Sequence, residues 1–251
     1  MDTIDNVKGS YRFLPGIEPF SSGVVAMPRF QVVHATLRYP MPWRKGFELI
    51  DRQLRAEGRP RAALCAVELR IPAPLTFDGF DAFNHGYRML LESWHLIVDG
   101  QNPIARTNVA PVVGAPDEPS LYGFAYTAPG GPDTPTFVVA GSGETRTREK
   151  SVNGLVRGGE TTPEAIREKA AYVLDVMHER LHALGADWTD VTAINIYTAH
   201  PIEPFLETTI LDHVGLAAIH GVTWHLSHPP VVDIEFEMDL RGVARRVWVS
   251  S

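Results

Sequence analysis

Apolar positions of the chain repeat at a constant spacing of 127 residues. Side chains at helical spacing form a stripe in the first half, and an equivalent stripe recurs in the second half. A glycine follows each stripe, as is typical of the residue after a helix, and a pattern of apolar strand residues follows each glycine. The stripes are Phe47, Ile50, Leu54 and Leu174, Met177, Leu181, and the glycines are Gly58 and Gly185. The pattern predicts a duplicated helix and strand.

The second copy of this helix has the clearer start. Thr162 is a residue type that caps helix N-termini, Pro163 suits the first helical position, and Glu164 carries the charge that the helix dipole favours there. We therefore predict a helix over 162–184.

The remaining pattern places further elements around the repeat. Strands are expected at 22–27, 30–38, 63–71, 105–113, 120–127, 135–141, 190–198, 219–226 and 231–239, and further helices at 79–95 and 202–214. Each half then has an α+β pattern of a sheet with two helices on one face. The segment 128–135, rich in proline and glycine, is typical of a linker. We expect domains at 1–127 and 136–251.

Composition narrows the class of protein. With 44% hydrophobic residues in 251, the chain can bury a sizeable core, and its net charge of −7 offers no basic surface for nucleic acid. No apolar run is long enough for a membrane span. The single cysteine, Cys65, cannot form an internal disulfide, so a cytoplasmic location is expected. Its apolar neighbours favour a buried core thiol.

Four short segments resemble signature segments of the reactive-intermediate deaminases, the Rid or YjgF-type family formerly called L-PSP. Two lie in the first half and two in the second, and their order and spacing are similar to those of the family. They are 19–25 (PFSSGVV), 102–109 (NPIARTNV), 137–143 (FVVAGSG) and 232–235 (VDIE).

The resemblance implies a fold class, α+β, with two tandem chorismate-mutase-like domains, each a β-sheet with two helices on one face. It also implies trimeric assembly. Ligand clefts would lie between neighbouring domains, where an arginine holds a carboxylate and a carboxyl group handles water.

Each half departs from this pattern at one position. The first half keeps the arginine at Arg106 but has Leu121 and Tyr122 where the acid is expected. The second half keeps Asp233 but has Ile219, His220 and Gly221 where the arginine is expected. The resemblance therefore implies either one composite cleft that combines Arg106 with groups of the second half, or one active and one inactive cleft.

Arg106 is the leading binding residue, because a guanidinium gives a carboxylate two parallel charge-assisted hydrogen bonds. Asp233 and Glu235 alternate with apolar residues in the expected strand 231–239, so they share a face and are the expected catalytic acids. A solvent-exposed strand face is the simpler interpretation of the same alternation. Other residues expected to contact substrate are Phe20, Gly141, Ser142 and His220.

Two histidine patterns suggest metal sites, but neither is complete. His178 and His182 match the H-E-x-x-H zinc motif, yet the position of a third ligand holds Trp188. His220, His225 and His228 are close in sequence, but strand alternation points His225 away from the other two. The glycine-rich segments lack the spacing of a nucleotide-binding loop. We expect neither a metal nor another cofactor.

The expected function is hydrolytic deamination, without a cofactor, of a small enamine or imine that bears a carboxylate, such as a 2-aminomuconate-like acid. Partners would be this small-molecule substrate and further copies of the chain, with a homotrimer favoured. Two alternatives remain: a chorismatase-like lyase or hydrolase, and a non-catalytic protein that binds a metabolite.

Overall fold

The computed structural model describes residues 2–146 and 152–250. Within these ranges, strands from both halves form one mixed sheet of twelve strands in the order β1-β2-β3-β8-β11-β9-β10-β6-β5-β7-β4-β12. The strands are β1 (Ile4–Asn6), β2 (Tyr11–Leu14), β3 (Gly23–Ala26), β4 (Phe30–Pro42), β5 (Leu64–Arg70), β6 (Ala105–Pro111), β7 (Ser120–Pro129), β8 (Phe137–Gly143), β9 (Ala193–Thr198), β10 (Thr223–His228), β11 (Glu237–Gly242) and β12 (Arg245–Val249).

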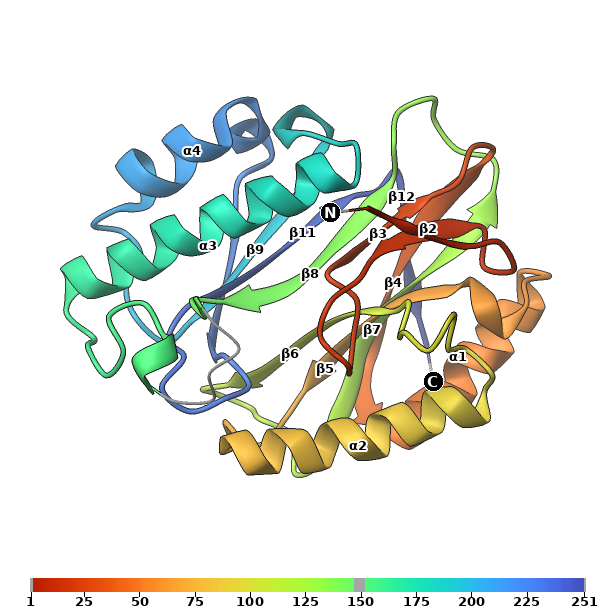
Figure 1. Cartoon of the computed structure of the whole chain (residues 1–251), viewed down its shortest axis with the longest axis horizontal. Coiled ribbons are helices and arrows are strands. Elements are labelled where there is room, and N and C mark those ends of the chain that lie inside the picture. The colour runs from red at the N-terminus through yellow and green to blue at the C-terminus, as the bar shows by residue number, and fades with distance from the viewer. Residues whose placement is uncertain (1, 147–151, 251) are drawn as a thin grey trace.

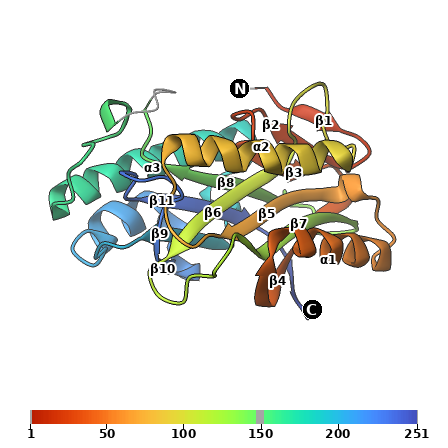
Figure 2. The same cartoon turned by 90° about the horizontal axis from the view of Figure 1, so that it is seen from below.

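The helices cover the strands from two sides. Figures 1 and 2 show α1 and α2 on one side of the strands and α3 on the other. The helices are α1 (Trp43–Ala56), α2 (Phe77–Ser93), α3 (Pro163–Ala183) and the single turn α4 (Asp212–Val214), which continues a π-helix (Leu206–Leu211). None of the described helices has both the length and the apolar character needed to cross a membrane.

Three groups of buried apolar side chains mark the layers. One group joins α3 to β8, β9 and β11, and a second joins α1 and α2 to β4, β5 and β7. The third lies between the strands of the two halves and includes the small residues Ala66, Ala105 and Ala140. The two halves of the sheet therefore face each other, with a helical layer outside each.

The predicted helix with the clearest start is confirmed. The side chain of Thr162 accepts a hydrogen bond from the Ala165 N–H at 3.2 Å, and Pro163 is the first residue of α3. Gly58 and Gly185 follow α1 and α3 with φ angles of +65° and +75°, which suit glycine. The helical stripes of both halves are buried.

The expected fold class is wrong. Two tandem chorismate-mutase-like domains would each have their own sheet, but β3 of the first half pairs with β8, and β12 of the second half pairs in parallel with β4. Strands β6 and β10 also join the halves. These hydrogen bonds make one sheet of the two halves. The domain boundaries at 1–127 and 136–251 stay a prediction.

Several expected elements of the second half have other boundaries. The helix expected at 202–214 is a π-helix followed by short helical turns, and the strand expected at 219–226 begins at Thr223. The strand expected at 231–239 begins at Glu237. Residues 231–236 form a turn and an irregular segment instead.

Candidate active site

Arg106 lies on β6 beneath α2, in an aromatic enclosure. Its side chain is buried, and its guanidinium carbon lies 4.8 Å from the ring centroids of both Phe20 and Tyr87. Phe80 and Phe83 of α2 complete the enclosure. Burial lowers the pKa of Arg106 to about 10, so the group is still charged at neutral pH. Phe20 and Arg106, both expected at the site from sequence, are thus brought together.

Among the described residues, Asn84 is the hydrogen-bond partner of the Arg106 guanidinium, and one guanidinium nitrogen is left without a partner. Its Nη2 donates a 2.6 Å hydrogen bond to Oδ1 of Asn84 on α2, whereas buried Nη1 has no partner among the described residues. Buried donors are rarely left unpaired. Nη1 is therefore a donor that an anionic group would satisfy.

Glu237, the first residue of β11, supplies a buried carboxyl group near this guanidinium. Burial raises the pKa of Glu237 to about 8, and the negative charges of Asp239 and Glu144 add to the rise. The positive charges of Arg106 and Arg180 oppose it. Glu237 is therefore largely protonated at neutral pH and can donate a proton.

Gly141 brings β8 close to this carboxyl group. The register of β8 and β11 shifts between Met238 and Leu240, which forms a bulge. A Cβ on Gly141 would collide with Oε1 of Glu237 and would lie 3.2 Å from Oγ1 of Thr107, the neighbour of Arg106 on β6. The absence of a side chain at 141 thus makes room for Glu237 where the two halves meet.

Arg180 of α3 holds the other side of the bulge. Its Nη1 donates to the Ala140 carbonyl at 3.0 Å, and its Nη2 donates to Oγ of Ser142 at 3.1 Å. Burial lowers the pKa of Arg180 to about 10. Ser142, expected to contact substrate, is accordingly engaged by an arginine of its own half.

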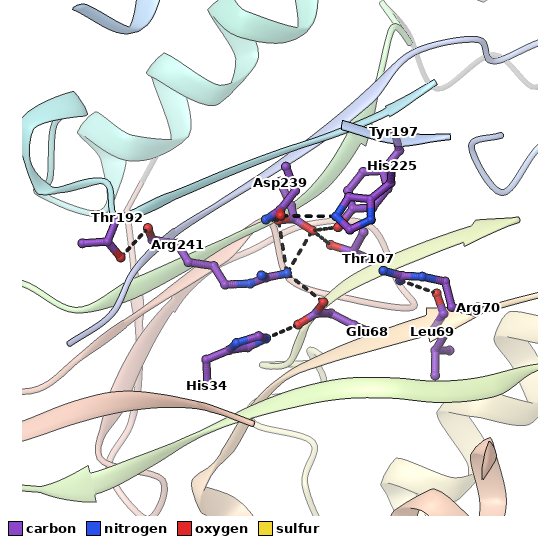
Figure 3. A network of polar contacts seen from close by, with 11 residues as sticks. His34, Glu68, Leu69, Arg70, Thr107, Thr192, Tyr197, His225, Asp239 and Arg241 are labelled. Atoms are coloured by element: carbon purple, nitrogen blue, oxygen red, sulfur yellow. Dashed lines mark hydrogen bonds and ion pairs between the residues drawn. The ribbon is translucent and has the colours of Figure 1, made fainter. Parts of the chain in front are cut away.

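A network of polar side chains continues from Thr107 between the two halves of the sheet (Figure 3). Asp239 accepts hydrogen bonds from Thr107 at 2.7 Å, from Asn195 at 2.7 Å and from the Tyr197 hydroxyl at 2.9 Å. His225 stacks on Tyr197 with ring centroids 4.8 Å apart, and burial lowers the pKa of His225 to about 4. Asp239 is therefore a fully engaged acceptor beside a neutral imidazole.

Arg241 links this network to the first half. Its Nη2 lies 2.8 Å from Oε2 of Glu68 and 3.3 Å from Oδ1 of Asp239, and Oε1 of Glu68 lies 2.5 Å from Nε2 of His34. Burial by itself would raise the pKa of Glu68, but the charges of Arg241 and His34 outweigh it and lower the pKa. A cavity of about 10 Å³, close to the space one water needs, lies among these side chains and Arg106.

The two acids expected from sequence, Asp233 and Glu235, lie outside this polar network. Asp233 is exposed in the turn before β11 with a φ of +71°, so the expectation that it extends from a strand is wrong. Glu235 is half-buried, also precedes the strand, and its Oε2 lies 2.8 Å from Nε2 of His200. Their catalytic roles stay predictions. The buried acids Glu237 and Asp239 were missed, although the same alternation continues through them.

The histidines whose sequence patterns suggested metal sites do not form such a site. His220 is exposed at the end of a 3₁₀ helix (Gly215–His220), and its expected contact with substrate stays a prediction. His178 and His182 are exposed on α3, and Nδ1 of His178 accepts a 3.2 Å hydrogen bond from Trp188. Across residues 2–146 and 152–250, no group of three or more His, Cys, Asp or Glu side chains is arranged to hold a metal ion.

Comparison with known proteins places the chain among deaminases. The family model described as 2-aminomuconate deaminase CnbZ matches residues 3–247. A 2-amino-5-chloromuconate deaminase from Comamonas testosteroni is 36% identical over 240 residues, which cover 94% of this chain and 95% of the relative.

Solved structures compare at the level of the fold. A chorismatase superposes with a TM-score of 0.50 at 15% identity, covering 89% of this chain and 77% of the chorismatase chain. This likeness supports the single large sheet over two small tandem domains. A cyanuric acid hydrolase matches with a TM-score of 0.39 at 11% identity, covering 88% of this chain and 70% of the other, which is too distant to support an argument.

Proposed function

The chain belongs to the 2-aminomuconate deaminase family, and from this premise we propose that it releases ammonia hydrolytically from a 2-aminomuconate-like enamine acid. Membership of the family confirms the expectation from sequence that the chain is an enzyme acting on C–N bonds. The observation that supports the proposed reaction best is the electrostatic interaction between buried Arg106 of the first half and the buried carboxyl group of Glu237 of the second.

Arg106 binds a carboxylate of the substrate in this proposal. Its Nη1 is buried without a partner in the described part of the chain, while Asn84 fixes the guanidinium through Nη2. The surrounding rings of Phe20, Phe80 and Phe83 offer flat apolar surfaces that suit a conjugated carbon chain. A charge-assisted contact in such a desolvated enclosure both binds and orients the substrate.

Glu237 moves the protons. Its protonated carboxyl group donates a proton to the enamine carbon, which converts the enamine into an iminium ion. The resulting carboxylate then accepts a proton from the water that adds to the iminium carbon, which gives a carbinolamine. Glu237 passes this proton to the amino group and takes up the proton of the carbinolamine hydroxyl as the C–N bond breaks, so that ammonia leaves and a 2-oxo acid remains. One water is consumed and one ammonia is formed, and Glu237 ends protonated as it began. No cofactor takes part in these steps.

Some finer expectations rest on the sequence alone. The relation to the Rid or YjgF-type family, the homotrimer and the cytoplasmic location stay predictions. The chorismatase-like alternative has the fold likeness in its favour, but a likeness at 15% identity does not extend to chemistry.

Ammonia release tests the proposal directly. The purified protein is mixed with freshly generated 2-aminomuconate, and ammonia is measured together with loss of the substrate's absorbance. A panel of shorter enamine acids measures how the length of the substrate's carbon chain affects the rate of ammonia release. We expect turnover of 2-aminomuconate by the wild type and at least a 100-fold lower rate for Glu237→Gln. Binding of the acid without ammonia release would instead favour a metabolite-binding protein.

A further inference from the structure

Unpartnered polar atoms cluster around Arg106. Of six buried side-chain nitrogen and oxygen atoms without a hydrogen-bond partner in the described ranges, four belong to three neighbouring residues. These atoms are Arg106 Nη1, the Tyr87 hydroxyl, and both Nδ2 and Oδ1 of Asn108. Since native proteins pair nearly all buried polar atoms, this concentration indicates a place where a ligand supplies the partners.

The three side chains lie on the same side of β6. In the parallel pairing with β5, Arg106 is opposite Val67 and Asn108 is opposite Leu69. Both Val67 and Leu69 belong to the apolar core that packs against α1 and α2. Because alternate strand residues share a face, Arg106 and Asn108 point toward α2.

Tyr87 faces Arg106 from α2. Its ring centroid lies 4.8 Å from the guanidinium carbon of Arg106, and the ring is completely buried. Alternate residues along a strand are roughly 7 Å apart, so the backbone positions of Arg106 and Asn108 are separated by about the length of a small functional group. A ligand held by Arg106 and Tyr87 can therefore reach Asn108.

The hydrogen-bonding character of the three groups defines the ligand. Arg106 Nη1 and the Tyr87 hydroxyl both donate, which suits the two oxygens of a carboxylate. Asn108 has a donor and an acceptor, and a carboxylate alone can satisfy only the donor. A carbon that bears both a carboxylate and an N–H group satisfies all of these atoms.

We propose that Arg106, Tyr87 and Asn108 together recognise the amino-carboxylate end of a planar 2-amino-2-enoate, with Asn108 Oδ1 accepting a hydrogen bond from the substrate's amino group. This inference rests on the proposed function and adds two specificity-determining residues, Tyr87 and Asn108. Asn108 Nδ2 donates to the carboxylate that Arg106 and Tyr87 hold. The site thereby distinguishes an amino acid from the corresponding acid without nitrogen.

Two stable planar probes test this recognition without catalysis. Pyrrole-2-carboxylate has an N–H on the carbon that bears the carboxylate, and thiophene-2-carboxylate has the same shape without a donor. Their affinities are measured by calorimetry for the wild type, Asn108→Leu and Tyr87→Phe. Tyr126→Phe serves as the matched control. Tyr126 lies on β7 and is another buried tyrosine whose hydroxyl has no hydrogen-bond partner within residues 2–146 and 152–250.

We expect the wild type to bind the pyrrole probe at least tenfold more tightly than the thiophene probe. Asn108→Leu should remove this preference while its melting temperature stays equal or rises, because the substitution deletes two unpartnered polar atoms. Tyr87→Phe should weaken both probes equally, and Tyr126→Phe should change neither. A purely structural role for Asn108 would instead lower the melting temperature and leave the preference intact.

The outcomes separate this inference from the proposed function. If the wild type releases ammonia from 2-aminomuconate but does not prefer the pyrrole probe, the recognition by Asn108 is overturned and the deaminase proposal stands. If the probe preference is present but no enamine acid is deaminated, the recognition site stands as that of an amino acid binder. Should Asn108→Leu not fold, Asn108→Val provides the same comparison, because valine also lacks a hydrogen-bonding group. Unchanged affinities in Tyr87→Phe would overturn the role of Tyr87.

Discussion

At the scale of single residues, Glu237 is the group whose ionisation should control the reaction. Its pKa is raised to about 8, chiefly by burial, so the protonated form that donates to the enamine carbon is depleted as the pH rises through 8. We expect kcat to fall above this pH, and Glu237→Gln to lower kcat by about 10²- to 10⁴-fold at pH 7. A pH profile of the wild type checks the first expectation. An unchanged rate at pH 9 would contradict it.

The same carboxyl group should make the wild type less stable at alkaline pH. Its pKa is higher in the folded protein than in an unfolded chain, so the folded state holds the proton more tightly. The resulting stability is fully present below about pH 4.5 and is lost as the pH rises toward 8. We therefore expect Glu237→Gln to unfold at a higher denaturant concentration than the wild type at pH 9. Glu235→Gln, on a half-buried side chain, is the control and should show a smaller difference.

Arg106 should be required for affinity. Removing one partner of a buried charge-assisted contact costs roughly 2–5 kcal/mol, so Arg106→Ala should reduce kcat/KM by at least about 30-fold. Arg157→Ala is a suitable control, because Arg157 is an exposed residue that pairs with Glu160 and Glu168. Steady-state kinetics with circular dichroism would show whether the loss occurs in a folded protein. Equal kinetics for the two variants would exclude Arg106 from binding.

Only part of the site could be predicted from the sequence. Arg106 and Phe20 stand in recognisable motifs, and Gly141 ends an apolar strand. Glu237 was predictable in principle, since it continues the alternation of Asp233 and Glu235, but the alternation does not say where the strand begins. Asn84 and Tyr87 reach Arg106 only because α2 packs over β6, and that packing is not encoded in a local pattern.

At the scale of elements, the bulge between β8 and β11 positions the carboxyl group. A Cβ at position 141 would occupy the space of the Glu237 carboxylate oxygen and would also lie 3.2 Å from Oγ1 of Thr107. We expect Gly141→Ala to displace Glu237 and to reduce kcat by at least tenfold. Gly86→Ala tests whether glycine loss alone has this effect, because a Cβ there would meet only the Arg44 guanidinium, at 3.8 Å. A Gly141→Ala enzyme with normal kcat would show that the bulge does not set the site.

A buried ion pair fixes α3 to the segment that leads into β11. Lys169 and Glu144 are both fully buried with Nζ and Oε1 2.9 Å apart, and Glu144 also accepts hydrogen bonds from the N–H groups of Glu235 and Phe236. Lys169→Met leaves a buried carboxylate without its counter-charge and should cost about 3–5 kcal/mol of stability. Adding Glu144→Gln should recover part of the loss. Chemical unfolding of the wild type and of these two variants measures both effects.

The elements that sequence predicted well have strong local signals. The helix predicted at 162–184 has a capping threonine, a proline at its first turn and a buried stripe. The observed helix α3 has nearly the same bounds. The elements after residue 200 lack such signals. There the expected boundaries came from analogy with the first half, whereas the chain forms a π-helix and starts both following strands later.

At the scale of the whole molecule, the repeat predicted the secondary structure of each half but not how the halves pair. The helix, glycine and strand recur at 47–70 and 174–197, and both copies form. Whether each copy completes its own sheet depends on contacts between residues over 100 positions apart, such as β3 with β8 and β4 with β12. Such contacts follow from how the facing surfaces fit, which motif order does not describe.

The shared sheet predicts that the two halves stabilise each other. If residues 1–135 and 136–251 are produced separately, the first loses β12 from the side of β4, and the second loses β3 from the side of β8. Glu68 and Arg241 also come from different halves, so separation removes the ion-pair partner of each charge. We expect neither fragment alone to unfold cooperatively, and an equimolar mixture to regain a single transition like that of the intact chain. Thermal unfolding followed by circular dichroism and tryptophan fluorescence measures this. Independent cooperative melting of both fragments would instead establish two domains divided at 128–135.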